Sequence, residues 1–88
     1  GCNQIADPII LMEAMELREA LVDAQSAGQV ELFIANVAAD VEECIGDLAV
    51  AFRKNDTDEA AKLTTRLRYL RKLIDESRAR RSRLADES

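Results

Sequence analysis

Residues 8–23 read PIILMEAMELREALVD, and this stretch decides both the fold class and the question of function. At about 100° per residue, a helix gathers one apolar set within about a third of its circumference, as expected of a core-facing stripe: Ile10, Ala14, Leu17, Leu21 and Ala24. A second apolar set falls on the opposite side, among acidic residues: Leu11, Met12, Met15 and Val22. A helix that buries one face has no folding reason to carry the other, so we expect the second face to have a separate role.

The composition is typical of an all-α domain. The 88 residues include three Gly, one Pro and few aromatic side chains, and a chain of this size forms one small domain. Residues 1–50 carry ten acidic side chains and one basic one, whereas residues 51–88 carry eleven basic and seven acidic ones, within a net charge of −5. The acidic first half, together with the lack of aromatic residues among the arginines, disfavours nucleic acid as a partner.

Local signals divide the chain into three helices. Asp7 and Pro8 form a helix start, because Asp accepts a backbone N–H as N-cap and Pro loses no hydrogen bond at the first helical position. Gly28 is typical of the residue just past a helix, and Asp56 and Glu59 have the spacing of a capping box. We predict helices at about 8–27, 29–54 and 57–80, joined as an antiparallel three-helix bundle over residues 7–78. Residues 1–6 are expected to be a linker end, and residues 79–88 a frayed, Arg-rich tail.

The apolar stripes of the second and third helices complete the predicted core. On one side of the second helix lie Val30, Phe33, Ile34, Val37, Val41, Cys44, Ile45, Leu48, Ala51 and Phe52. The stripe of the third helix consists of Ala60, Leu63, Leu67, Leu70 and Ile74. Leu73 is predicted at the edge of that stripe and Tyr69 well outside it. Gly46 costs about 0.5–1 kcal/mol relative to Ala inside a helix, which suggests a closely packed neighbour.

The residue composition disfavours several classes of function. The chain has no histidine and only two cysteines, Cys2 and Cys44. It therefore lacks a nucleophile–base pair and the usual ligands of zinc or haem, so we expect no enzymatic activity, no metal and no cofactor. Cys44 is expected to be a small buried apolar residue. No apolar run approaches the roughly 18 residues of a membrane span, and no signal-like segment is present, so we predict a cytoplasmic protein with reduced thiols.

The second apolar face of the first helix has three candidate roles: it binds a partner, docks onto a further domain, or is ordinary surface. Partner binding fits best, because flexible Met side chains adapt to different shapes and a rim of carboxylates steers a basic partner. A second copy of the chain is the alternative occupant, which would make the domain a self-associating structural module. Tyr69 is either a surface residue or an interface anchor, and the sequence leaves both readings open.

Three segments resemble one known family. LMEAMELREAL (11–21), VELFIANV (30–37) and RLRYLRKL (66–73) are similar to the three helices of the C-terminal domain of HscB-type J-domain co-chaperones of iron–sulfur cluster assembly. The resemblance spans about residues 7–80, with the segments in the right order. It implies a domain that binds the IscU-type iron–sulfur scaffold protein, within a co-chaperone that delivers this scaffold to an Hsp70 of the HscA type. The family's J-domain acts through a His-Pro-Asp motif, and because the chain has no histidine we expect that domain to be absent from these residues.

The resemblance also implies a binding surface. It would consist of Leu11, Met12, Met15, Glu16, Glu19 and Asp23, with Tyr69 beside them on the third helix. Met15 stands where the family usually has Leu, Asp23 where it has Glu, and Tyr69 where it has Phe. Each change keeps the character of its position, so we expect a tuned affinity for the same type of partner. We further expect a monomer, with no nucleic-acid or membrane partner.

Overall fold

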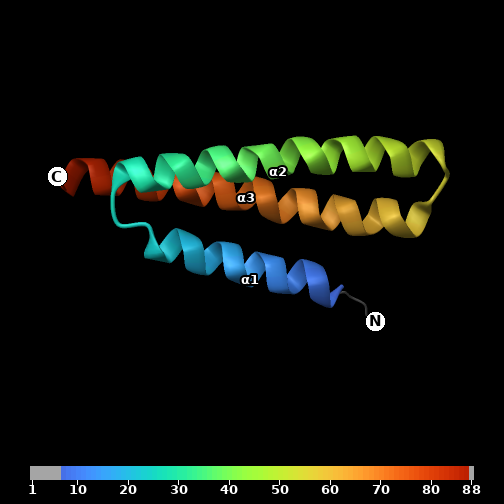
Figure 1. Cartoon of the computed structure of the whole chain (residues 1–88), viewed down its shortest axis with the longest axis horizontal. Coiled ribbons are helices and arrows are strands. Elements are labelled where there is room, and N and C mark those ends of the chain that lie inside the picture. The colour runs from blue at the N-terminus through green and yellow to red at the C-terminus, as the bar shows by residue number, and fades with distance from the viewer. Residues whose placement is uncertain (1–6, 88) are drawn as a thin grey trace.

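The chain folds into three helices that run alternately back and forth (Figure 1). The structure is a computed structural model that describes residues 7–87, and the predicted linker end and Cys2 lie outside the described residues. The helices are α1 (Pro8–Asp23), α2 (Ala27–Arg53) and α3 (Thr57–Glu87). They form an elongated, flat body of 49 × 27 × 15 Å between Cα atoms. The prediction of an all-α, antiparallel three-helix bundle is confirmed.

The core lies mainly between α2 and α3, which pack along most of their lengths, whereas α1 makes far fewer contacts with either (Figure 1). The most deeply buried apolar side chains are Val30, Val37, Cys44 and Leu70, each with 0% exposure. The α1 segment adds only Leu21, together with Ala24 just after it, to the fully buried cluster. Cys44 donates its thiol hydrogen to the Leu63 carbonyl at 3.3 Å, so the prediction that it is buried is confirmed.

Several apolar positions differ from the predicted stripes. Ile45 and Phe52, both predicted in the stripe of the second helix, are 39% and 63% exposed and do not belong to the core. In α3, Leu73 is 3% exposed while Ile74 is only partly buried, so the centre of the stripe is rotated toward α1. The structure shows no closely packed neighbour at Gly46, since apart from the adjacent residues and the nearby backbone of α2 no atom lies within 4 Å of the position that a Cβ would take.

The first helix ends earlier than predicted, at Asp23 and not at residue 27. Gly28 lies in the first turn of α2, which is capped by Ser26: the Ser26 hydroxyl accepts the Gln29 N–H at 3.1 Å. The Gln29 side chain in turn accepts the Gln25 N–H at 2.7 Å. Ser26 and Gln29 thus act as a variant of the capping box, and this signal prevails over the C-terminal preference of Gly28.

The turn between α2 and α3 follows the predicted signals more closely. Asn55 has the left-handed φ of 57°, and the N–H groups of Asn55 and Asp56 donate to the Phe52 and Ala51 carbonyls at 3.1 and 2.9 Å. This pattern is a Schellman motif, which ends α2. The Asp56 carboxylate then accepts the Glu59 N–H at 3.1 Å and caps α3. Because the Asp56 N–H is already bonded to Ala51, the capping box is one-sided.

The prediction of a frayed tail at 79–88 is wrong for its described part, because α3 continues to Glu87. Arg81 pairs with Glu31 at the start of α2 at 3.2 Å, and Leu84 packs against the core. Ser77 is 0% exposed, and its hydroxyl donates to the Leu73 carbonyl at 2.7 Å. An antiparallel partner for the 27 residues of α2 has to be about as long, so the Arg-rich segment lies beside the first turns of α2 and not in free solvent.

Candidate functional site

The side of α1 that faces away from the other helices is apolar at its centre. Leu11, Met12 and Met15 are 57%, 59% and 61% exposed. Val22 extends the same side toward the end of the helix, and three exposed carboxylates border it. We call this set the α1 outer face: Leu11, Met12, Met15, Glu16, Glu19, Val22 and Asp23. Among residues 7–86, its carboxylates take part in no ion pair.

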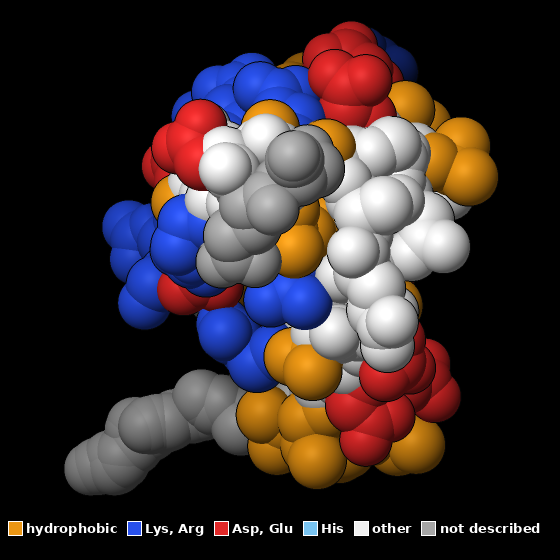
Figure 2. Space-filling view, turned by 90° about the vertical axis from the view of Figure 1, so that its left-hand side faces the viewer, with side chains coloured by type: hydrophobic (Ala, Val, Ile, Leu, Met, Phe, Trp, Pro, Cys, Tyr) orange, Lys and Arg blue, Asp and Glu red, His pale blue; other side chains and the backbone are white. Residues whose placement is uncertain are grey.

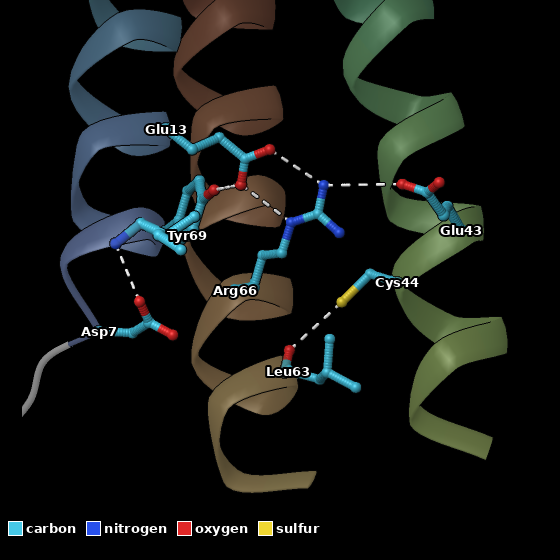
Figure 3. A network of polar contacts seen from close by, with 8 residues as sticks. Asp7, Glu13, Glu43, Cys44, Leu63, Arg66 and Tyr69 are labelled. Atoms are coloured by element: carbon cyan, nitrogen blue, oxygen red, sulfur yellow. Dashed lines mark hydrogen bonds and ion pairs between the residues drawn. The ribbon is translucent and has the colours of Figure 1, made fainter. Parts of the chain in front are cut away.

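Tyr69, the predicted site residue on α3, is half-buried and turned toward α1, where its hydroxyl donates to Glu13 Oε1 (Figure 3). Its ring borders a groove of about 420 Å³ between the start of α1 and α3. Leu11 lines the same groove from α1, and Ala61 and Thr65 line it from α3. The structure therefore places Leu11 and Tyr69 on one groove, although they lie far apart in the sequence.

The other predicted site residues follow the length of α1. Met15, Glu19 and Asp23 border an open hollow of about 570 Å³, together with Arg18 and Val22. Met12 and Glu16 are exposed on the same helix and line neither hollow. The site is thus a continuous strip along α1, with a groove at one end that α3 completes.

A polar network joins α1 to α3 directly beneath the groove (Figure 3). Arg66 approaches both oxygens of the Glu13 carboxylate, with Nε at 2.9 Å from Oε1 and Nη2 at 3.0 Å from Oε2. Its Nη2 also lies 3.8 Å from Glu43 Oε1 on α2, so a single guanidinium connects all three helices. The side chains of Arg66 and Glu13 are only 15% and 31% exposed, which strengthens their interaction relative to a pair on the open surface.

The ionisation of this network follows from its contacts. Burial acts to raise the pKa of Glu13, but the hydrogen bonds from Arg66 and Tyr69 and the charge of Arg66 outweigh it, so the pKa falls below its ordinary 4.5. Burial, and then the adjacent Glu13 carboxylate, raise the pKa of Tyr69 above its ordinary 10. The hydrogen bond to Glu13 raises the pKa of Arg66 as well. Near neutral pH the network therefore contains a carboxylate, a guanidinium and a neutral phenol.

Sequence reasoning missed Glu13 and Arg66, although one signal was present. Glu13 lies three residues after Ile10 and four before Leu17, which places it on the core side of α1. An acidic residue at such a position requires a cationic partner, and Arg66 is three residues from the single tyrosine on the same side of α3.

Further polar contacts hold α1 along its length. Lys62 pairs with Asp7 at 3.7 Å and Arg18 pairs with Glu76 at 3.1 Å. At the other end, Arg80 Nη2 donates to the carbonyls of Val22 and Ala24 at 3.1 and 2.9 Å. These carbonyls belong to the end of α1, where no later turn supplies hydrogen-bond donors. The helix that carries the candidate site is therefore attached by polar contacts at its rim in addition to the apolar contacts of Leu17, Leu21 and Ala24.

The described part of the chain shows neither a metal site nor a membrane span. In residues 7–87 no group of three or more His, Cys, Asp or Glu side chains is arranged to hold a metal ion. None of the three described helices has an apolar stretch long enough to cross a membrane.

Comparison with known proteins identifies the family. A family model described as the HscB C-terminal oligomerisation domain matches residues 6–78. The chain belongs to this HscB family. It is 38% identical over 69 residues to the mouse (Mus musculus) iron–sulfur cluster co-chaperone protein HscB, covering 78% of this chain and 30% of the mouse protein. It is 31% identical over 72 residues to the HscB homolog of Arabidopsis thaliana, covering 82% of this chain and 29% of that protein.

The HscB match confirms the resemblance seen in the sequence and fixes its extent. The chain spans about 30% of the length of these curated relatives, and no solved structure matches it. The mouse and plant proteins are named co-chaperones of iron–sulfur clusters, so the family is one of co-chaperones and not of enzymes. The match ends at residue 78, whereas α3 continues to Glu87 with contacts of its own.

Proposed function

We propose that this HscB-type domain binds an IscU-type iron–sulfur scaffold protein through the α1 outer face. The observation that carries the proposal is the exposure of three large apolar side chains, Leu11, Met12 and Met15, on one helix face bordered by unpaired carboxylates. Burying an exposed Leu or Met side chain completely contributes about 1.5–3 kcal/mol. Since these three are already partly covered, together they would supply about 3–5 kcal/mol to an interface.

The carboxylates would attract a basic partner and fix its position along α1. Glu16, Glu19 and Asp23 lie along one helix, exposed and free of ion pairs within residues 7–86. Rim charges of this kind mainly raise the association rate of a partner with basic groups. Tyr69 would extend the contact onto α3, because it borders the groove that Leu11 lines and is held in place by Glu13. The preferred partner surface is therefore apolar at its centre and basic at its edge.

Within a complete co-chaperone, the role of the domain would be to hold the scaffold while another region recruits an Hsp70 of the HscA type. We assign that recruitment to a J-domain, which we expect to lie outside these 88 residues. The domain itself would neither catalyse a reaction nor bind a cofactor. It would contribute affinity and orientation, and the cluster chemistry would remain with the scaffold.

A titration with an apo IscU-type scaffold protein, followed by backbone amide shifts, tests the proposal. We expect shifts concentrated on residues 11–23 and around Tyr69. A variant with Leu11→Ser, Met12→Ser and Met15→Ser should lose binding while keeping its helicity. The matched control is Leu32→Ser on α2, which removes a residue that is 65% exposed outside the proposed surface and should bind normally. Shifts confined to α2, or undiminished binding by the triple variant, would contradict the proposal.

The steering role has a separate test. Glu16→Gln combined with Glu19→Gln should slow association and flatten its dependence on salt, because the Debye length falls from about 10 Å at 0.1 M to about 3 Å at 1 M. Glu42→Gln, which alters an exposed acidic residue on α2, serves as the control. An unchanged salt slope in the double variant would show that these carboxylates do not steer the partner.

Self-association is a second candidate function, and one finding favours it: the matching family model is described as an oligomerisation domain. We propose that the α1 outer face also contacts a second copy of the chain. Sedimentation over a range of concentrations tests this directly. A weight-average mass that rises above 9.8 kDa with concentration is expected, whereas a constant 9.8 kDa would rule this function out.

A further inference from the structure

The basic residues of α3 fall into two groups. Those that face α1 and α2 form ion pairs or hydrogen bonds within the domain: Lys62, Arg66, Arg80 and Arg81. The remaining five are all exposed and, within residues 7–86, unpaired: Arg68, Arg71, Lys72, Arg78 and Arg83. At about 100° per residue these five occupy about 140° of the circumference of α3, and two acidic residues, Asp75 and Asp86, lie in the same sector. We call them the α3 outer strip.

The α3 outer strip and the α1 outer face carry opposite charges on separate surfaces of one molecule. Figure 2 shows Lys and Arg side chains gathered on one side of the view, and hydrophobic and acidic side chains at its lower edge, where α1 lies. One pair of charges in each row also has the same spacing. Glu16 and Asp23 are seven positions apart, as are Arg71 and Arg78, which at 1.5 Å per residue is about 10 Å in each case.

We infer that the α1 outer face of one copy docks on the α3 outer strip of a second copy. This inference rests on the self-association proposed above and names its counter-surface. The carboxylates of α1 would meet the unpaired arginines, while Met and Leu side chains would lie on the apolar stems of the Arg and Lys residues. Both surfaces belong to every copy, so each molecule offers one of each.

Other ligands fit the strip less well. A net charge of −5, with ten acidic groups in the first 50 residues, opposes the approach of a polyanion such as nucleic acid. Binding of single-stranded nucleic acid also uses aromatic side chains between the cations. The one tyrosine of the chain, Tyr69, is turned toward Glu13 and away from this role. The counter-charge of suitable length that the structure does provide is on α1.

The contact would be weak and would compete with scaffold binding. The 16 residues of α1 make a helix about 24 Å long, and one face of such a helix buries less than the roughly 1,200 Å² that stable complexes need. The association should therefore be transient and sensitive to salt. Because it covers Leu11, Met12 and Met15, it would exclude the scaffold from the same residues. The scaffold would then displace the second copy from the α1 outer face.

A charge-exchange experiment tests the inference on the whole 88-residue chain. Sedimentation would compare wild type, a variant with Glu16→Lys and Glu19→Lys, and a variant with Arg71→Glu and Arg78→Glu, from about 10 μM to about 1 mM. Each variant alone places like charges opposite each other, so its association constant should fall at least about fivefold. An equimolar mixture should associate again, because the basic α1 of the first variant then meets the acidic α3 of the second, and the unaltered α1 of the second meets the unaltered α3 of the first. Arg53→Glu with Lys54→Glu, outside the strip, is the matched control.

The outcomes separate this inference from the proposals on which it rests. Restored association in the mixture, together with normal scaffold binding by the Arg71→Glu/Arg78→Glu variant, supports it. Association that survives both charge reversals overturns the inference but keeps self-association. A wild-type chain that remains monomeric throughout overturns both, while the scaffold titration still decides the first proposal. Circular dichroism confirms that each variant is folded.

Discussion

Replacing Glu13 by Gln should destabilise the domain by about 2 kcal/mol, because the change removes the charge that Arg66 and Tyr69 share. A hydrogen bond to a charged group contributes about 1.5–3 kcal/mol net. Glu13 receives two from Arg66, at 2.9 and 3.0 Å, and one from Tyr69. Gln retains one acceptor oxygen, and the pair is 15% and 31% exposed, so the loss should be well below the sum of the three bonds.

Urea unfolding followed by circular dichroism measures this loss. A decrease of about 2 kcal/mol lowers the folding equilibrium constant by about 30-fold, and the melting temperature of a domain this small by roughly 10 °C. Tyr69 provides an independent readout, because it is the single tyrosine and its ionisation changes its ultraviolet absorption. In Glu13→Gln the pKa of Tyr69 should move down toward its ordinary 10.

Glu16→Gln is the matched control, since it makes the same chemical change three residues further along the exposed side of α1. It should alter the free energy of unfolding by less than about 0.5 kcal/mol. If Glu13→Gln behaved like this control and left the tyrosine titration unchanged, the network would not hold α1 in place. The proposed position of Tyr69 beside Leu11 would then lose its support.

Two further predictions concern the same attachment of α1. The folded-state pKa of Glu13 lies below 4.5, so the stabilisation of the fold by Glu13 should be complete above pH 4.5 and lost as the pH falls through the folded-state pKa. The folded-state pKa of Tyr69 lies above 10, so the stabilisation by Tyr69 should be complete below pH 10 and lost as the pH rises through the folded-state pKa. The free energy of unfolding should be measured across pH in wild type, Glu13→Gln and Tyr69→Phe. The loss of stability at low pH should be absent in Glu13→Gln, and the loss at high pH should be absent in Tyr69→Phe. Arg80→Gln should cost about 1 kcal/mol and speed amide exchange near the end of α1, whereas Arg78→Gln, which alters an exposed and unpaired residue, should change neither; equal effects would refute the role of Arg80.

The exposed apolar side of α1 was accessible to sequence reasoning because helical periodicity alone separates it from the core side. Leu11, Met12 and Met15 lie on the solvent side, as their spacing predicts. The starts of α1 at Pro8 and of α3 at Thr57 also followed from local capping residues. Information that lies within a few residues of the chain was therefore sufficient for the fold class and for the outer side of α1.

Features that depend on distant pairs were not accessible in this way. The Glu13–Arg66 contact joins residues 53 positions apart, and Arg80 reaches a carbonyl 56 positions away. The end of α1 was misplaced because Gly28 and the Ser26–Gln29 pair give conflicting local signals, and the carbonyls of the true end are satisfied from α3. The Arg-rich end of α3 resembles a solvent-exposed tail in the sequence, because its contact with Glu31 joins residues that are far apart in the chain.

The attachment of α1 by rim contacts has a consequence for affinity. The α2–α3 hairpin contains most of the buried residues, whereas α1 supplies one of its own, Leu21. We therefore expect two cooperative units of unequal stability, with α1 opening more often than the hairpin unfolds. A partner that recognises the docked helix binds only that fraction of molecules, so its apparent dissociation constant is the intrinsic value divided by the docked population. The Glu13–Arg66 pair and the hydrogen bonds of Arg80 would then change the affinity for the partner without contacting it, because these residues line neither hollow of the α1 outer face.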